Sequence, residues 1–195
     1  MKLIPLTKGK FAQVDDEDFE WLNQWKWQAG ECSVKGTFRA QRRDSCGKTV
    51  LMHRQIMGVS ERWVLIDHKN GNPLNNQRYN IRVATTLQNG QNRGVHKNNT
   101  SGYKGVTWSN QHKKWMVGIR VEYARRFIGL YDNIEDAARS YNCVAKRVFG
   151  AFARFNHVSP MFPDIEVNME IGRANYYGFV GIHKSGKKFM AEIDR

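Results

Sequence analysis

Three strand-like stretches followed by one helix-like stretch constrain the fold of this chain most, and they lie in its second half. Residues 103–108, 114–121 and 125–131 alternate apolar and polar side chains and are separated by turn-forming segments. Asn133 can cap the helix that follows, and Gly150 can end it. The apolar residues of that helix recur every three or four positions, which gives it one face to pack on a sheet. We therefore expect a three-stranded antiparallel sheet packed on one helix.

Alternation along the middle strand separates an apolar face from a basic one. Successive side chains of a strand point to opposite faces of the sheet. Trp115, Val117 and Ile119 therefore share the face toward the helix, whereas Lys114 and Arg120 share the other face. Basic side chains on a sheet face can bind phosphates or read guanine edges in DNA.

This region also resembles a known family of DNA-binding domains. SGYKGVTW…KKWMVGIRV…RRFIGLYDNIEDAARSYNCVAKRVFGAFARFN is similar to the APETALA-type (ethylene-response-factor) domain over nearly its whole length. That family places a three-stranded sheet in the major groove, with the helix packed behind it. Gly118 stands where the family often has Glu, and Thr107 replaces a usual arginine, so the family's preferred sequence does not carry over. The resemblance implies these DNA-facing residues: Lys104, Thr107, Lys114, Arg120, Arg125 and Phe127.

A second stretch, residues 64–92, carries side chains suited to hydrolysis. VLIDHKNGNPLNNQRYNIRVATTLQNGQN predicts a short strand, an Asn-rich loop, a second strand at 81–84 and a helix-compatible tail. Phosphodiester hydrolysis needs a base that activates water and a cation that neutralises charge on the phosphate. Asp67 offers a hard oxygen ligand for such a cation, and His68 can act as a base near neutral pH. A lone Asp-His pair is weak evidence, because most such pairs are surface polar residues.

The spacing beyond His68 is more specific. Asn80 follows His68 by 12 residues, and Asn89 follows Asn80 by 9. Together with the intervening NGNPLNNQRYNIRVAT, this resembles the HNH endonucleases, specifically the phage and intron-encoded homing-type branch, which folds the segment as a ββα-metal finger. The resemblance implies that His68 is the general base and that Asn80 pins the finger and orients His68. It implies that Asp67 and Asn89 hold one divalent metal ion, magnesium or manganese.

Other residues around this stretch are open to two interpretations. The branch commonly has Asp where this chain has Asn75, which affects the loop geometry more than the catalytic residues. Arg78 and Arg82 flank Asn80, and each is a candidate phosphate contact or a solvated loop charge. The resemblance continues upstream through LMHRQIMG, where His53 is either structural or phosphate-contacting.

The first fifty residues predict a small α+β framework. Acidic residues precede a helical patch that carries Phe19, Trp21 and Trp25 at helical spacing. GTFRAQRRD and KTVLMHRQIMG then predict strands on either side of a turn at Ser45–Gly47. The HNH resemblance extends back through most of this framework.

The charge distribution favours a polyanionic partner. The net charge is +13, of which residues 51–100 carry +5 and residues 101–157 carry +6. Such a surface predicts strong, salt-dependent binding to nucleic acid, and a charge that only maintains solubility is the alternative. We expect double-stranded DNA as the partner, because nothing here resembles an aromatic platform for stacking RNA bases. We also expect a monomer on DNA and no small-molecule cofactor.

Cysteine usage and hydropathy indicate the compartment. Cys32, Cys46 and Cys143 are odd in number and far apart, which argues against a disulfide framework and a zinc knuckle and fits a reducing cytosol. No apolar run approaches the ~20 residues of a membrane span. We therefore expect a cytoplasmic protein without a membrane partner, in the host cytosol if a phage encodes it.

Two segments of the chain are similar to each other in sequence. GYKGVTW…KKWMVGI at residues 102–119 reappears as GFVGIHK…KKFMAEI at residues 178–193, which we interpret as a partial second copy. Chance similarity between two amphipathic hairpins is the alternative. The predicted organisation is a nuclease domain at 1–95 with its finger core at about 64–93, a linker at 96–101, a sheet domain at 102–157 and the partial copy at 158–195.

The expected fold class is thus α+β, with a ββα-metal finger embedded in an N-terminal α+β domain and a sheet-and-helix domain after it. The expected function is that of a metal-dependent, site-specific DNA endonuclease. A non-catalytic, sequence-specific DNA-binding regulator with a degenerate finger is the alternative.

Overall fold

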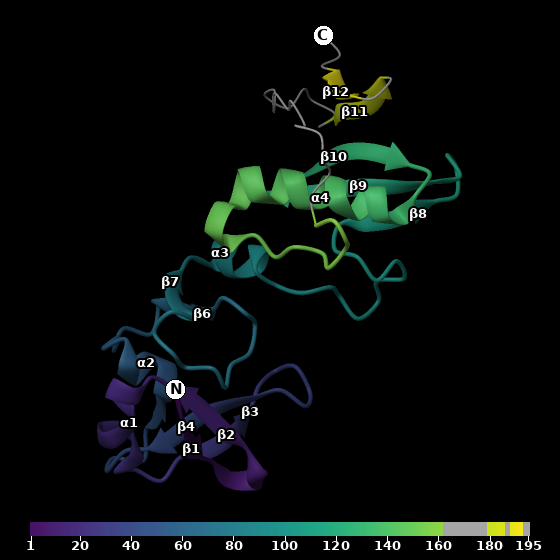
Figure 1. Cartoon of the computed structure of the whole chain (residues 1–195). Coiled ribbons are helices and arrows are strands. Elements are labelled where there is room, and N and C mark those ends of the chain that lie inside the picture. Colours follow the sequence, from purple (N-terminus) through teal and green to yellow (C-terminus); the bar gives the residue numbers. More distant parts are fainter. Residues whose placement is uncertain (162–178, 186–187, 193–195) are drawn as a thin grey trace. The chain divides into compact units, whose positions relative to one another are not determined.

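The computed structural model describes residues 1–161, 179–185 and 188–192. These residues form an α+β structure with four α-helices and several small sheets, most of them antiparallel (Figure 1). The chain divides into two compact units, Met1–Gly90 and Gln91–Arg195. Among the helices in these ranges, none combines the length and the hydropathy that crossing a bilayer requires.

The first unit begins with a hairpin and a helix. β1 (Lys2–Pro5) pairs antiparallel with β2 (Phe11–Val14), and a short 3-10 turn, Thr7–Gly9, connects them. The helix α1 (Asp16–Asn23) follows Asp15 and has three acidic residues in its first turn, where the helix dipole favours negative charge. The predicted helical patch is confirmed for Phe19 and Trp21, whereas Trp25 lies beyond the end of the helix.

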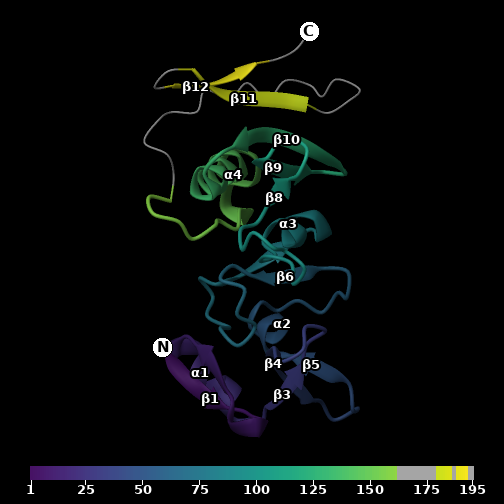
Figure 2. The same cartoon turned by 90° about the vertical axis from the view of Figure 1, so that its right-hand side faces the viewer.

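A three-stranded antiparallel sheet and a short helix follow. β3 (Gln28–Glu31), β4 (Phe38–Arg43) and β5 (Thr49–Leu51) lie in that order, and α2 (Met52–Ile56) packs against β4 and β5 (Figure 2). The prediction of a strand throughout KTVLMHRQIMG is therefore wrong in its second half. The four-residue spacing of Met52 and Ile56 lets a helix bury both of them on one face, where they are 0% and 5% exposed.

Apolar side chains from these elements form one core. Leu22 is completely buried, and the Trp27 ring is 3% exposed. Trp27 Nε1 donates to the Leu22 carbonyl at 2.8 Å, which ties the end of α1 to the segment after it. Ile81 is part of this core, and Ile66 packs against it. The core therefore fixes the strand pair that carries the candidate site.

That strand pair ends the first unit. β6 (Leu65–His68) pairs antiparallel with β7 (Ile81–Ala84), and the helix α3 (Thr86–Gln91) follows. The predicted strand at 81–84 is confirmed. The register places Asp67 opposite Arg82 and His68 opposite Ile81.

The second unit is a sheet covered by a long helix. β8 (Val106–Ser109), β9 (Lys114–Val121) and β10 (Ala124–Tyr131) are antiparallel neighbours, and α4 (Ile134–Phe149) lies across one face of them (Figure 1). The predicted sheet packed on one helix is thus confirmed. Val117 and Ile119 face the core, as the alternation predicts.

Local signals define the ends of α4. The Asn133 side chain accepts a hydrogen bond from the Glu135 amide at 2.7 Å, and Gly150 caps the C-terminus with a φ of 52°. Gly105 lies under the helix with a φ of 78°, and a Cβ at this position would come within 2.2 Å of the Tyr141 ring. Only glycine fits this approach of backbone to ring.

Two more strands continue the sheet of the second unit. β11 (Phe179–Ser185) pairs in parallel with β10 and antiparallel with β12 (Lys188–Glu192). They are the described part of the predicted partial copy at 158–195, which otherwise lies largely outside the described residues.

Candidate active site

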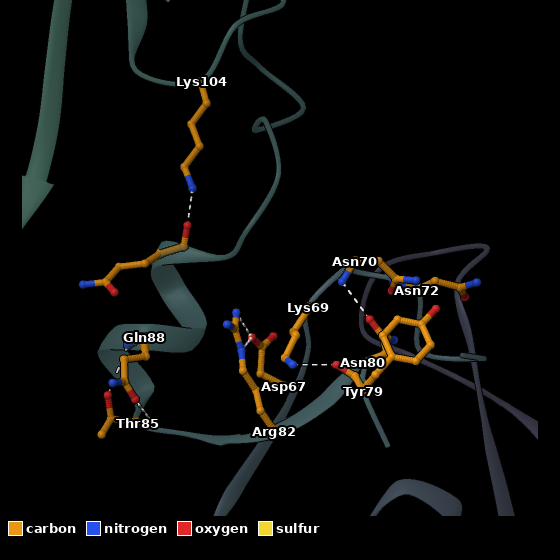
Figure 3. A network of polar contacts seen from close by, with 11 residues as sticks. Asp67, Lys69, Asn70, Asn72, Tyr79, Asn80, Arg82, Thr85, Gln88 and Lys104 are labelled. Carbon is orange, nitrogen blue, oxygen red and sulfur yellow. Dashed lines mark hydrogen bonds and ion pairs between the residues drawn. The ribbon is translucent and has the colours of Figure 1, made fainter. Parts of the chain in front are cut away.

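Asp67 and Arg82 form a buried ion pair across β6 and β7. Arg82 donates to Asp67 Oδ2 from Nε at 3.0 Å and from Nη2 at 2.8 Å (Figure 3). The two side chains are 6% and 12% exposed, respectively. Such a charge-assisted pair fixes the position of the carboxylate. Arg82, a candidate phosphate contact in the sequence, is therefore also the partner of the predicted metal ligand.

His68 ends β6 in a buried position. Its Nε2 lies 3.5 Å from Asn76 Oδ1, and Asn76 is itself completely buried. Burial lowers the pKa of His68 from its ordinary value, against smaller opposing effects of Asn76 and Asp67. The imidazole is consequently neutral at pH 7, which is the state that a general base requires.

His53 lies beside His68, although 15 residues separate them in the sequence. The two rings meet edge to face, with 5.1 Å between their centroids. Burial, with the nearby charges of His68, Arg54 and Arg39, lowers the pKa of His53 to about 3. Its Nδ1 is buried and has no hydrogen-bond partner among the described residues. Sequence reasoning left this residue open, and the only signal for it was the LMHRQIMG similarity.

Asn80 fastens the loop that joins β6 to β7. Its Oδ1 accepts from the Asn70 amide at 3.0 Å (Figure 3). Its Nδ2 donates to the Asn75 carbonyl at 2.7 Å. Its own carbonyl accepts from the Lys69 amide at 2.8 Å. Because the Asn80 side chain is buried, these bonds hold both ends of the loop against β6.

Asn89 lies on α3, half-buried, one turn into the helix. The helix start is fixed by a reciprocal cap, in which the Gln88 side chain accepts from the Thr85 amide and the Thr85 hydroxyl accepts from the Gln88 amide (Figure 3). Oxygen donors from Asp67 and Asn89 are of the kind that magnesium and manganese bind. No group of three His, Cys, Asp or Glu suited to a metal occurs within the described ranges.

Arg78, a predicted phosphate contact or solvated loop charge, binds two acidic residues near the start of the first unit. Its guanidinium donates to Asp18 Oδ1 at 2.7 Å and to Asp18 Oδ2 at 2.9 Å, and its amide donates to Asp15 at 2.7 Å. Asp18 is 1% exposed. Arg78 therefore ties the loop to α1, while its side chain remains 48% exposed.

Lys104 also differs from its prediction as a DNA-facing residue. Its Nζ donates to the Gln91 carbonyl and to the Arg93 carbonyl, the second at 2.7 Å. Burial, with a smaller effect of Arg154, lowers its pKa to about 8. The ammonium thus binds backbone within its own unit instead of pointing from the sheet face.

The remaining predicted sheet residues share the face away from α4. Arg120 and Arg125 are exposed cross-strand neighbours, and Gly118 leaves room for the Arg125 side chain to lie across it. Phe127 pairs with Gly118 in the register and is half-buried. Thr107 is exposed on β8, and Lys114 on β9 pairs with Asp132 at 3.2 Å.

Comparison with known proteins gives two viral relatives. Protein 3.8 of Escherichia phage T7 is 37% identical over 90 residues, which are 46% of this chain and 74% of that protein. An uncharacterized HNH endonuclease of Acanthamoeba polyphaga mimivirus is 29% identical over 161 residues, 80% of each chain. No family model matches the chain, and no solved structure matches it. The chain belongs to the same family as protein 3.8 of phage T7.

Proposed function

We propose that this protein is a metal-dependent DNA endonuclease of the HNH type. The observation that carries the proposal is a buried His68, its pKa lowered by burial, next to Asp67 at the end of β6, where Asn80 holds the loop that follows. The similarity to a viral protein named an HNH endonuclease, over 80% of both chains, supports the same assignment.

His68 would act as the general base. In the tautomer whose Nε2 donates to Asn76 Oδ1, Nδ1 would carry the lone pair that takes a proton from water. The water oxygen attacks the phosphorus, and the bond to one ester oxygen breaks as that oxygen takes up a proton. Burial keeps the imidazole neutral before the reaction, so the lone pair is available at neutral pH.

Asp67 and Asn89 would hold one divalent cation, magnesium or manganese. When bound, that ion supplies charge neutralisation at the phosphate. Arg82 keeps the Asp67 carboxylate oriented through its two hydrogen bonds. With two oxygen ligands from the protein, the remaining coordination positions of the ion would be available to water and phosphate, as is usual for magnesium.

The sheet of the second unit would bind the target duplex, in the manner of an APETALA-type domain. The supporting feature is the exposed pair Arg120 and Arg125 on the face away from α4. Thr107, Lys114 and Phe127 lie on the same strands and complete the proposed surface.

Separate measurements of cutting and binding test the ligand assignment. We expect Asp67→Asn and Asn89→Ala to abolish magnesium-dependent cutting of plasmid DNA, whereas duplex binding without magnesium stays unchanged. Asn99→Ala, at a half-buried asparagine of the second unit, is the matched control and should cut like wild type. Unchanged cutting by the first two variants would refute the assignment.

A further inference from the structure

The first unit contains a large open groove that none of the predicted site residues lines. Its volume is about 1190 Å³, and its walls come from β4, β5, α2 and the segment after α2. Its lining contains no Asp or Glu. Six cationic residues line it: Arg39, Arg42, Arg43, Lys48, Arg54 and Arg62.

The positive charges of this groove are not neutralised by neighbours. Within the described residues, none of the six cations forms an ion pair with a carboxylate. Arg78 and Arg82 in the same unit do form such pairs. The carboxylate nearest in sequence to the β4–β5 turn, Asp44, accepts from the amides of Cys46 and Lys48 and so serves the turn itself.

Several of these cations are held in fixed positions by uncharged partners. The Arg42 guanidinium lies 4.4 Å from the centre of the Trp25 ring, and its Nε donates to the Gln55 side chain at 3.2 Å. Arg54 donates to the Val64 carbonyl at 2.7 Å and also to the Glu61 carbonyl. Such contacts orient a guanidinium and leave its full charge for an anion.

The groove is linked to the candidate active site through α2. Arg54 follows His53 directly on α2, and the charges of Arg54 and Arg39 help to lower the pKa of His53. The His53 ring in turn contacts His68. One wall of the groove is therefore one residue along α2 from a ring that contacts the proposed base.

We propose that this groove binds the sugar–phosphate backbone of duplex DNA beside the phosphate at His68. Closely spaced cations bind DNA by releasing its condensed counterions, and arginine forks match phosphate oxygens in geometry. The identity of the polyanion rests on the proposed function, whereas the basic groove itself does not. The first unit would then bind DNA independently of the sheet in the second unit.

Removal of charge inside and outside the groove tests the proposal. One variant combines Arg43→Gln, Lys48→Gln and Arg62→Gln, which are exposed residues of the groove. The matched control combines three exposed lysines of the same unit outside the groove: Lys10→Gln, Lys26→Gln and Lys35→Gln.

Binding of a short fluorescent duplex is measured by anisotropy over a series of sodium chloride concentrations, without magnesium. At about 0.1 M sodium chloride the groove variant should bind at least about tenfold more weakly. Its slope of log K against log salt should fall by about 2.7 if each of the three residues contacts one phosphate. The control should change the slope by less than about 1. Equal affinities and slopes for the two variants would overturn the proposal.

Chemical protection provides a second measurement on the unaltered protein. Bound duplex should slow acetylation of Lys48 relative to that of Lys35, which lies outside the groove. Equal acetylation rates of Lys48 with and without DNA would also overturn the proposal. Neither readout uses cleavage. If the groove variant binds DNA more weakly than the control but the wild-type protein never cuts DNA, the nuclease assignment is refuted and the groove proposal stands. If the wild-type protein cuts DNA but the groove variant binds as the control does, the groove proposal is refuted and the nuclease assignment stands.

Discussion

Acidification should destabilise the first unit through His53. Its pKa is about 3 in the folded protein because the ring is buried, whereas the ordinary value is 6.5. Between these values the unfolded chain binds a proton that the folded chain does not, so the free energy of unfolding falls as the pH falls below 6.5. The contribution of His53 is fully present above that pH and is progressively lost toward pH 3.

The size of the effect follows from the unfolded pKa. Lowering the pH from about 7.5 to about 5 should cost about 2 kcal/mol through His53 alone. The value depends little on the folded pKa, because the folded ring stays neutral over this whole interval. His68 adds a loss of the same sign, since burial lowers its pKa too.

Urea unfolding followed by tryptophan fluorescence at the two pH values measures this loss. His53→Phe keeps an aromatic ring but removes the proton site, so it should reduce the pH-dependent loss by about 2 kcal/mol relative to wild type. His96→Phe, at an exposed histidine, should leave the loss unchanged. If the pH-dependent loss of unfolding free energy is smaller in His53→Phe than in wild type by less than about 1 kcal/mol, the argument that burial keeps this imidazole neutral is refuted.

Three further predictions concern the second unit. Asn133→Ala should lower the free energy of unfolding by about 1 kcal/mol, because the amide of the first helical turn loses its acceptor, and Asn133→Ser should restore most of the loss in urea titrations. Gly105→Ala should lower the free energy of unfolding by at least about 2 kcal/mol, because the new Cβ would clash with the Tyr141 ring and the backbone has a positive φ. A thermal midpoint equal to that of wild type would contradict this. Arg120→Ala should weaken duplex binding by about 1–3 kcal/mol if the side chain makes a bidentate base contact, and unchanged affinity in anisotropy titrations would remove it from the proposed surface.

The elements with strong local signals could be predicted from the sequence. α4 has an asparagine cap, acidic residues in its first turn and a terminal glycine, and all of these act within a few residues. β9 alternates clearly enough in sequence for its core face to be assigned. α2 was missed because its five residues provide less than two helical turns of pattern, and the preceding β-like run suggested a continuing strand.

The partners of the candidate site could not be predicted, because they come from distant parts of the chain. Arg78 binds Asp18, which lies 60 residues away in the sequence, so nothing local distinguished it from a solvated loop charge. Lys104, in the turn before β8, binds backbone carbonyls of residues 91 and 93, which no side-chain pattern encodes. The edge-to-face contact of His53 with His68 likewise joins residues of α2 and β6 that are 15 positions apart. The spacing of Asp67, His68 and Asn80 located the region but not these contacts.

Cleavage of supercoiled plasmid DNA tests the central claim most directly. We expect wild-type protein to nick or linearise the plasmid with magnesium or manganese and to be inactive with EDTA. His68→Ala should be inactive while binding duplex DNA as wild type does, and His96→Ala, at an exposed histidine, should cut normally. Wild-type protein that binds DNA but cuts none with either metal, or a His68→Ala variant that cuts at the wild-type rate, would contradict the account.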